Sequence, residues 1–293
     1  MDIPVPIYLS KNNLLIADGA TGSILMEAGL PPGMPPEIWN VEKPEKVMAL
    51  HKAYLDAGSK VILTNTFGGS QIKLRKFGLG DRTREFNIAA VGLARQIAGG
   101  KAYIAGDVGP IGELMAPMGS LTYDHALESF SKQVEALVDG GVDLIWIETM
   151  SDLSEARAAV VAARQVTELP VFCSLSFGKK GRTMMGVSPK QAAQELWPLG
   201  LSAIGANCGE GLDMIPEVLL QLREVLPHAI LITKPNAGLP RLVKGKTVYD
   251  MTPSEFATRM TEFIALGARV VGSCCGSNPY YIAALVEASS EFI

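Results

Sequence analysis

The sequence predicts a (β/α)₈ barrel, and three observations lead to this fold class. Short apolar runs rich in β-branched residues recur along the chain, and each ends in glycine or a polar residue. Amphipathic segments with a helical period separate these runs. The length of 293 residues also suits one such barrel, which typically has about 250 residues. We therefore expect a single domain over residues 1–293.

Eight runs are expected to form the strands of this barrel. They are LLIADG (14–19), KVILTNTF (60–67), AYIAGDVGP (102–110), VDLIWIET (142–149), PVFCSLSF (170–177), LSAIGANCG (201–209), AILITKPNAG (229–238) and ARVVGSCCG (268–276). Segments 43–58, 122–141 and 188–200 have amphipathic helical patterns that end in glycine, as helices often do. A doubly wound open sheet is the alternative. Its usual G-x-G-x-x-G after the first strand is absent, because that strand ends in DGATGS.

The composition excludes several classes of function. Hydrophobic residues make up 48% of the chain and charged residues 19%, which is enough apolar material for a large core. The net charge is −4 and no cluster of Lys and Arg occurs, so nucleic acid is not an expected partner. Neither a signal peptide nor a membrane span is indicated. We expect a cytoplasmic protein, where paired cysteines indicate metal or redox chemistry more often than a structural disulfide.

Polar residues crowd one rim of the predicted barrel, at the strand ends where barrels carry their chemistry. These ends read Asp18-Gly19, Asn65-Thr66, Asp107, Glu148-Thr149, Ser174 and Ser176, Asn207-Cys208, Asn236, and Cys274-Cys275. Two predicted loops over the same rim contain Met115, Met118, Met184 and Met185. These methionines either cover a bound molecule or fill gaps beneath the loops.

Three of the four cysteines follow strands that lie close together in the barrel order. Cys208 ends the sixth run, and Cys274 and Cys275 end the eighth, so only one strand separates them. Three thiolates would give zinc a site with one open position, the pattern of a catalytic zinc. Two adjacent residues can reach one metal only where the strand has ended or bent, which Gly272 and Gly276 permit. The alternatives are ordinary buried thiols and a disulfide between the adjacent cysteines.

The remaining cysteine and the histidines have no metal-binding pattern. Cys173 lies inside the fifth run and is expected to pack in the core. His51, His125 and His228 fall in predicted helices or just before a strand at the opposite rim. We expect helical or surface roles for them.

Eight short stretches along the chain form a recognisable set. They are DGATGS (18–23), TNTFGG (64–69), GDVGPIGELMAPMGSLT (106–122), ET (148–149), GRTMMGVSP (181–189), GANCG (205–209), KPNAGLP (234–240) and GSCCG (272–276). In this order they resemble the homocysteine S-methyltransferase family, and two of them are most similar to the homocysteine-binding barrel of cobalamin-dependent methionine synthase. The chain departs from the family pattern at Ala20 and Ser273, where glycine is usual, and at Ser23, where threonine is usual.

The resemblance implies a zinc-dependent methyltransferase that converts L-homocysteine to L-methionine. Cys208, Cys274 and Cys275 would be the zinc ligands and catalytic residues, with the homocysteine thiol as the fourth ligand. Coordination removes the thiol proton, so the sulfur can attack a methyl group without a general base.

The amino acid part of homocysteine also needs partners on the protein. Glu148 and Asp18 are candidates for its ammonium group. A carboxylate after the apolar DLIWI would be costly without a partner, whereas an aspartate before glycine also suits a turn. Backbone N–H groups of Gly19 and Ala20 are candidates for its carboxylate. The other candidates for binding substrate are Asn65, Thr66 and Asn236.

The methyl donor is expected to be a separate methyl-corrinoid protein or a small sulfonium or ammonium compound such as S-methylmethionine. One barrel leaves no room for a cobalamin-binding domain, and the motifs similar to methionine synthase favour the corrinoid partner. Transfer to a different thiol or selenol is an alternative. A non-enzymatic metal-storage or redox barrel is a further alternative, but it would not need Asp18 and Glu148.

Overall fold

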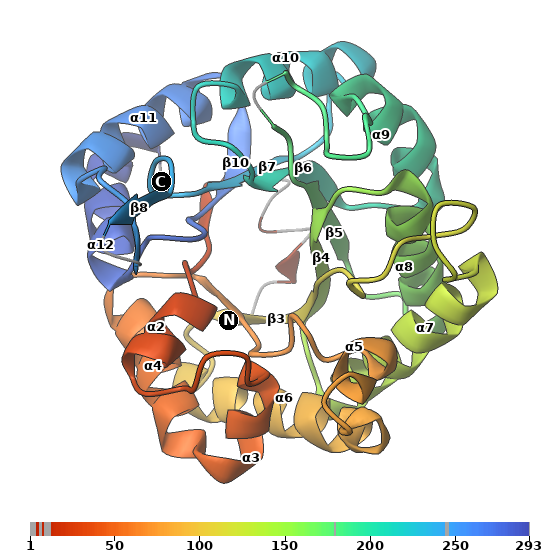
Figure 1. The fold of residues 1–293 in the computed structure, drawn as a ribbon. Coiled ribbons are helices and arrows are strands. Elements are labelled where there is room, and N and C mark those ends of the chain that lie inside the picture. Colours follow the sequence, from red (N-terminus) through yellow and green to blue (C-terminus); the bar gives the residue numbers. More distant parts are fainter. Residues whose placement is uncertain (1–3, 6–7, 9–12, 179, 244–245, 293) are drawn as a thin grey trace.

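The chain folds into a barrel of parallel strands surrounded by helices (Figure 1). The structure is a computed structural model and describes residues 4–5, 8, 13–178, 180–243 and 246–292. The strands of the barrel are β1 (Leu15–Ile16), β2 (Val61–Leu63), β3 (Tyr103–Val108), β4 (Leu144–Met150), β5 (Val171–Leu175), β6 (Ala203–Cys208), β7 (Leu231–Pro235) and β10 (Ala268–Val271). The predicted fold class is confirmed, and each predicted run overlaps one of these strands, although β4 extends one residue beyond its run, to Met150.

Barrel strands that follow one another along the chain lie side by side, and the first strand, β1, also pairs with the last, β10. The eight-stranded sheet has the order β1-β10-β7-β6-β5-β4-β3-β2, and every pair in it is parallel. Its two edges meet where Ala17 pairs with Val61. Two backbone hydrogen bonds support this closure, from Asp18 N to Val61 O (3.1 Å) and from Lys60 N to Ile16 O (2.7 Å). All strands therefore end at one rim.

Helices form the outer ring in Figure 1 and cover the apolar outer face of the strands. They are α2 (Gly22–Glu27), α3 (Trp39–Glu42), α4 (Pro44–Asp56), α5 (Gln71–Arg75), α6 (Thr83–Ala98), α7 (Tyr123–Gly140), α8 (Leu153–Val166), α9 (Pro189–Leu196), α10 (Ile215–Val225), α11 (Pro253–Ala265) and α12 (Pro279–Ala288). Short 3₁₀ helices are η1 (Pro36–Ile38), η2 (Gly80–Arg82), η3 (Trp197–Leu199) and η4 (Ser290–Phe292). Among the described residues, no helix is long and apolar enough to span a membrane.

A small hairpin adds to the eight predicted units. β8 (Arg241–Val243) pairs antiparallel with β9 (Lys246–Val248) in the connection between β7 and α11. Tyr249 follows directly after this hairpin. The connection thus returns the chain to the rim at which the strands end.

The barrel interior consists of an apolar layer and, nearer the rim where the strands end, a polar layer. Alternate residues of the strands face inward and form one core cluster that includes Ala105, Trp146, Phe172 and Ile232. The next inward positions belong to polar residues, namely Asp107, Glu148, Ser174, Asn207 and Lys234, all of them buried. The alternation along each strand therefore places a buried polar layer between the apolar core cluster and the rim.

Candidate active site

Three cysteine sulfur atoms converge at the rim. The Sγ atoms of Cys208, Cys274 and Cys275 all lie within 4.8 Å of one another. Cys208 is the last residue of β6, and the other two follow β10, which has already ended at Val271. The strand end lets two neighbouring side chains serve one centre, as the sequence had indicated. All three cysteines are free thiols in the structure.

Backbone irregularities aim these sulfur atoms. Cys208 has a φ of 56° and Gly209 follows with a φ of 76°, so the chain leaves the strand direction abruptly at the first ligand. Cys274 N donates to Pro235 O (2.9 Å), and Ala237 N donates to Cys275 O (3.0 Å). These two bonds fasten the loop after β10 to the end of β7 and to the residues that follow it. Strand β7 lies between β6, which carries Cys208, and β10, which precedes the other two cysteines.

The thiol cluster has the electrostatics of a cation site. Hydrogen bonds from Cys274 and Cys275 lower the pKa of Cys208 to about 3. Bonding to Cys208 raises the pKa of Cys275 to about 11 and that of Cys274 well above its ordinary value. The cluster thus loses one proton readily and retains the others, because three thiolates at this distance repel one another. A divalent cation would offset that repulsion, so the donor set fits zinc.

Tyr249 lies against the cluster and was not singled out from the sequence. Its side chain hydrogen-bonds to Cys275, and burial together with the nearby thiols raises its pKa to about 12. A Cβ atom on Gly276 would lie 2.1 Å from the tyrosine ring. Gly276 therefore leaves the space that this ring fills, and its φ of 80° suits glycine.

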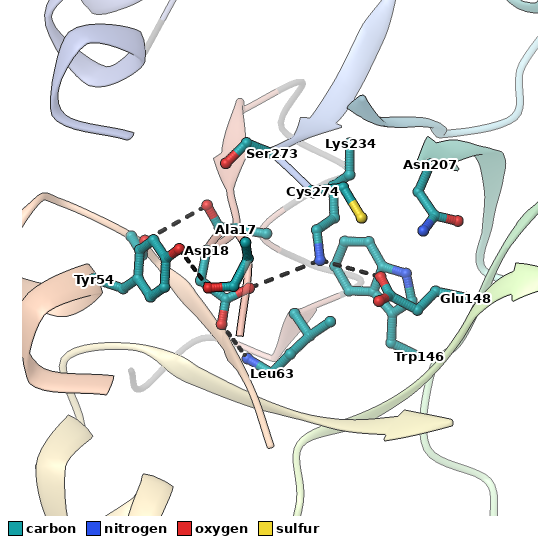
Figure 2. Close-up of polar contacts among 12 residues, drawn as sticks. Ala17, Asp18, Tyr54, Leu63, Trp146, Glu148, Asn207, Lys234, Ser273 and Cys274 are labelled. Carbon is teal, nitrogen blue, oxygen red and sulfur yellow. Dashed lines mark hydrogen bonds and ion pairs between the residues drawn. The ribbon is translucent and has the colours of Figure 1, made fainter. Parts of the chain in front are cut away.

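A buried lysine lies beside the thiols, within the polar layer (Figure 2). Lys234 Nζ is 3.1 Å from Glu148 Oε2 and 3.7 Å from Asp18 Oδ1. It also lies 4.9 Å from the ring centroid of Trp146. Its side chain is only 2% exposed, so these groups replace water as its partners.

Lys234 Nζ lies closer to Glu148 than to Asp18, and both carboxylates act on the pKa of the lysine. Burial lowers the pKa of Lys234, but the carboxylates of Glu148 and Asp18 outweigh burial and raise it overall. Burial raises the pKa of Asp18 to about 7, although Lys234 and the N–H of Leu63 counteract it. Leu63 N donates to Asp18 Oδ2 over 2.8 Å. Asp18 Oδ2 thus has a hydrogen-bonding partner, whereas Oδ1 has none among the described residues and faces Lys234 Nζ only at ion-pair distance.

Glu148 is held in place by the residues around the end of β4. Thr149 follows it with a φ of 63°, a strained conformation for a β-branched residue. Asn207 stabilises that turn, because its Oδ1 accepts from Thr149 N (2.7 Å) and its Nδ2 donates to Thr149 Oγ1 (2.6 Å). Ser174 Oγ also donates to Asn207 Oδ1 (2.8 Å). Lys234 of β7 therefore contacts the carboxylate itself, whereas the residues of β5 and β6 fix the backbone that follows it.

The other residues predicted to bind substrate have partners within the protein. Asn65 Nδ2 donates to Pro36 O (2.8 Å) and Asn40 Oδ1 (2.9 Å), and Thr66 Oγ1 donates to Asp107 O (2.7 Å). Asn236 Nδ2 donates to Gly209 O (2.9 Å), and its side chain also hydrogen-bonds to Cys208. Asn236 thus lies at the thiol cluster, whereas Asn65 ties the loop after β2 to η1 and α3, and Thr66 ties the same loop to β3. Their roles toward substrate stay predictions.

Ser273, one of the departures from the family pattern, has a clear structural role. Its Oγ donates to Ser277 Oγ (2.8 Å), which in turn donates to Cys274 O (2.7 Å). Ala20 N donates to the same Ser277 Oγ (3.2 Å), so one of the N–H groups predicted for the substrate carboxylate is engaged. A Cβ on Gly19 would lie 2.5 Å from Ser273 Oγ, which explains the glycine there.

Two charged residues of this layer were not assigned a role from the sequence. Lys234 was hidden in the stretch KPNAGLP, although a lysine inside an apolar strand is unusual enough to signal an ion pair. Asp107 was noted only as a polar strand end. It is 6% exposed and faces the same layer as Glu148. The alternation Tyr103, Ala105, Asp107 would have placed it inside the barrel.

Comparison with known families identifies the chain. The sequence model described as homocysteine S-methyltransferase matches residues 15–289. The chain belongs to this family. Members of the family are methyltransferases, and the match spans both the thiol cluster and the charged layer.

Individual relatives show where the similarity lies. The chain is 31% identical to methionine synthase of Mycobacterium tuberculosis over 292 residues and 30% identical to that of Mycobacterium leprae over 289. The alignments cover 93% and 92% of this chain but only 24% of each relative. Among solved structures, two forms of the Escherichia coli homocysteine methyltransferase MmuM share the fold. The oxidized form has a TM-score of 0.81 at 24% identity and coverage of 98% and 99%, and the metallated form 0.79 at 24% with 94% and 96%.

Proposed function

We propose that this protein transfers a methyl group to the thiolate of L-homocysteine, forming L-methionine, at a zinc ion bound by Cys208, Cys274 and Cys275. The observation that carries this proposal is the convergence of three thiol sulfurs within 4.8 Å beside a buried layer of carboxylates. The first feature suits a thiol that must lose its proton, and the second suits an α-amino acid. The two motifs that resemble methionine synthase, and the 31% identical relative of that name, support the same reaction.

Different residues of the chain would bind the two ends of the acceptor, its sulfur and its α-amino acid group. A zinc ion held by the three cysteines would keep the acceptor sulfur as a thiolate, the nucleophilic form. Glu148 would bind the α-ammonium group. Lys234 holds one of its oxygens at 3.1 Å, while Asn207 fixes the backbone after it. The amino acid end would thereby be oriented, and the sulfur would stay at the rim, where a methyl donor could reach it.

A separate protein carrying a methyl-corrinoid is the donor that we favour. Two rim loops present methionines to solvent, with Met118 60% exposed in the loop after β3 and Met184 91% exposed in the loop after β5. Exposed methionines are frequent at surfaces that receive another protein. S-methylmethionine and other small sulfonium or ammonium compounds are the second class of donor. Met115 is 4% exposed and fills the core instead.

Metal analysis tests the zinc centre separately from the reaction. The wild-type protein is expected to contain about one zinc per chain, and Cys208→Ser is expected to lose it. Cys173→Ala is the matched control, because Cys173 is a buried cysteine of β5 outside the cluster. A metal-free wild type with a reversible disulfide between Cys274 and Cys275 would refute the zinc proposal.

A matrix of acceptors and donors tests the reaction. Homocysteine is offered to the zinc-loaded protein with a methylated corrinoid, with S-methylmethionine or with betaine, and methionine is measured. We expect methionine with at least one donor and none with Cys208→Ser. If no donor yields methionine while the zinc is intact, the assignment of homocysteine fails.

A further inference from the structure

Tyr249 gives Cys275 a hydrogen-bonding partner that lies outside the thiol cluster. The tyrosine is half-buried, and its side chain hydrogen-bonds to Cys275. A phenol keeps its proton near neutral pH, so its hydroxyl donates this bond once the cysteine has become a thiolate. The ring lies against the backbone of Gly276, where an added Cβ atom would overlap it. Tyr249 is therefore placed at the most exposed of the three clustered cysteines.

The chain on both sides of Tyr249 is held in place. Before it, β8 and β9 pair as an antiparallel hairpin. After it, Asp250 Oδ2 forms an ion pair with Arg241 Nη2 at the start of that hairpin (2.7 Å). The hydroxyl of Tyr281 on α12 then donates to Met251 O. The position of Tyr249 is therefore set by the hairpin and by α12, and its hydroxyl is presented to the cluster from a fixed frame.

A methyl donor at the rim would meet more than one thiolate. Under the proposed function, one zinc ion binds three cysteine sulfurs and the acceptor sulfur. Methylation forms an S–C bond while the bond between the methyl carbon and the donor breaks, and the donor leaves with that electron pair. The same step at a cysteine would turn a charged zinc ligand into an uncharged thioether. Cys275 is the cysteine at greatest risk, because it is exposed whereas Cys208 and Cys274 are half-buried.

A hydrogen bond makes a thiolate a weaker nucleophile. The bond stabilises the charged form of the sulfur, and the nucleophilicity of a thiolate falls as its basicity falls. Cys208 has two such donors outside the cluster, the backbone N–H of Gly209 and the side chain of Asn236. Tyr249 supplies the corresponding bond to Cys275. Both sulfurs are therefore bonded in a way that reduces their reactivity toward a methyl group.

We propose that Tyr249 prevents methylation of Cys275 in place of the acceptor, through the hydrogen bond from its hydroxyl to the ligand sulfur. Tyr249 acts through a zinc ligand, so it determines which sulfur is methylated without taking part in the transfer itself. The inference rests on the proposed function, because it assumes that the three cysteines hold zinc. Loss of the hydroxyl should therefore lead to methylation of the protein at one particular cysteine.

Methylation of the zinc-loaded protein tests the inference without an acceptor. The protein is treated with iodomethane, a small neutral methyl donor, and the methylation of each cysteine is followed by peptide mass spectrometry with fragmentation. Tyr249→Phe keeps the ring and removes the hydroxyl. It is expected to speed methylation of Cys275 by on the order of 3- to 10-fold, because only part of the strength of a charge-assisted hydrogen bond appears in the rate. Methylation of Cys208 should keep its wild-type rate.

Two controls make the result specific to the hydrogen bond. Tyr280→Phe removes the hydroxyl of a tyrosine on α12 that is 75% exposed, and it should leave the methylation rate of Cys275 unchanged. The zinc content of each protein is measured before iodomethane is added, because a loss of metal would free all three sulfurs. Tyr249→Phe is expected to hold about one zinc per chain, as the wild type is.

The inference fails if Cys275 is methylated equally fast in Tyr249→Phe and the wild type, or if the rate rises alike at all three cysteines. It also fails if Tyr249→Phe holds no zinc, because the tyrosine would then be needed for metal binding itself. Failure of the proposed function looks different, since it consists of a wild type without zinc or without methionine from any donor. A zinc-loaded wild type that forms no methionine, but in which Tyr249 selectively protects Cys275, would retain the inference and lose the reaction.

Discussion

The thiol cluster and the charged layer beneath it are built in opposite ways. The cluster is made by departures from regular structure, namely the positive φ of Cys208, the end of β10 before Cys274 and the turn at Gly276. The charged layer continues the regular alternation of β3, β4 and β7, and its side chains are buried by the barrel itself. The cluster is open to solvent at Cys275, whereas Lys234 is only 2% exposed.

Because the two regions are built differently, substitutions in them should affect different properties of the protein. Changes in the layer leave buried charges without partners, so they should lower the stability of the whole barrel. Changes in the cluster alter a loop held by a few backbone bonds, so they should mainly reduce metal affinity. Substitutions in the two regions can therefore be told apart by measuring unfolding and metal binding on the same proteins.

Lys234→Met should produce the largest change in stability. The substitution leaves Glu148 and Asp18 buried together without their cation, and breaking a buried pair in this way typically costs about 3–5 kcal/mol. Urea denaturation measures the loss in the free energy of unfolding. Lys52→Met is the control, because its ion pair with Asp56 is exposed and should contribute at most about 1 kcal/mol. Equal stability of Lys234→Met and the wild type would show that the lysine is not the counter-ion of this layer.

Asp18 should make the stability of the barrel depend on pH. Its pKa in the folded protein is raised to about 7 from an ordinary value of 3.8, so the folded state binds the proton more tightly than the unfolded chain. The contribution of Asp18 to stability therefore falls as pH rises from about 4 to about 7, by no more than about 4 kcal/mol.

Asp18→Asn tests this dependence through the difference in unfolding free energy between wild type and variant at several pH values. That difference should move in favour of the variant as pH rises through this window. Asp56→Asn, at an exposed position, provides the baseline. A difference that does not vary between pH 4 and pH 7 would contradict the assigned shift.

The sequence predicted the cluster better than the layer, and the reason is physical. Cys208, Cys274 and Cys275 were visible because cysteine is rare in this chain and because all three sit at strand ends. The strand order then followed from eight apolar runs, since parallel strands joined by helices have few arrangements. Those two facts were enough to bring residues 208 and 274 together.

The partners within the layer could not be read from the sequence alone. Whether Lys234 meets Glu148 or Asp18 depends on register and on the depth of each side chain in the barrel, and strand boundaries are uncertain by a few residues. Tyr249 contacts Cys275 only because an unpredicted hairpin returns the chain to the rim. Ser273 likewise needed the position of Ser277, a residue in no predicted element.

Gly276→Ala should lower metal affinity more than it lowers stability. Alanine at a positive φ costs about 1–2 kcal/mol, and its Cβ would also displace the ring of Tyr249 from Cys275. Zinc affinity is measured by competition with a chelator, alongside denaturation. Gly141→Ala is a close control, because Gly141 has a φ of 91° but no atom within 4 Å of the added Cβ. If both variants keep the affinity of the wild type, Tyr249 has no part in holding the cluster.

Ser273→Ala should have the smallest effect, and it tests whether the two regions are independent. Ser273 joins them, because its N donates to Asp18 O (3.1 Å) and its hydroxyl reaches Cys274 O through Ser277. Alanine keeps the backbone bond and removes the hydroxyl, at a cost of about 1 kcal/mol in unfolding free energy. Ser289→Ala, another fully buried serine with a hydroxyl bond to Leu285 O, should cost about as much.

The informative measurement on Ser273→Ala is zinc affinity. If the cluster is held by its own backbone bonds, to Pro235 O and from Ala237 N, the affinity should match that of Ser289→Ala. A selective loss in Ser273→Ala would mean that the serine pair transmits strain from the end of β1 to Cys274. The thiol cluster and the charged layer would then form one cooperative site, and substitutions in the layer should also reduce metal binding.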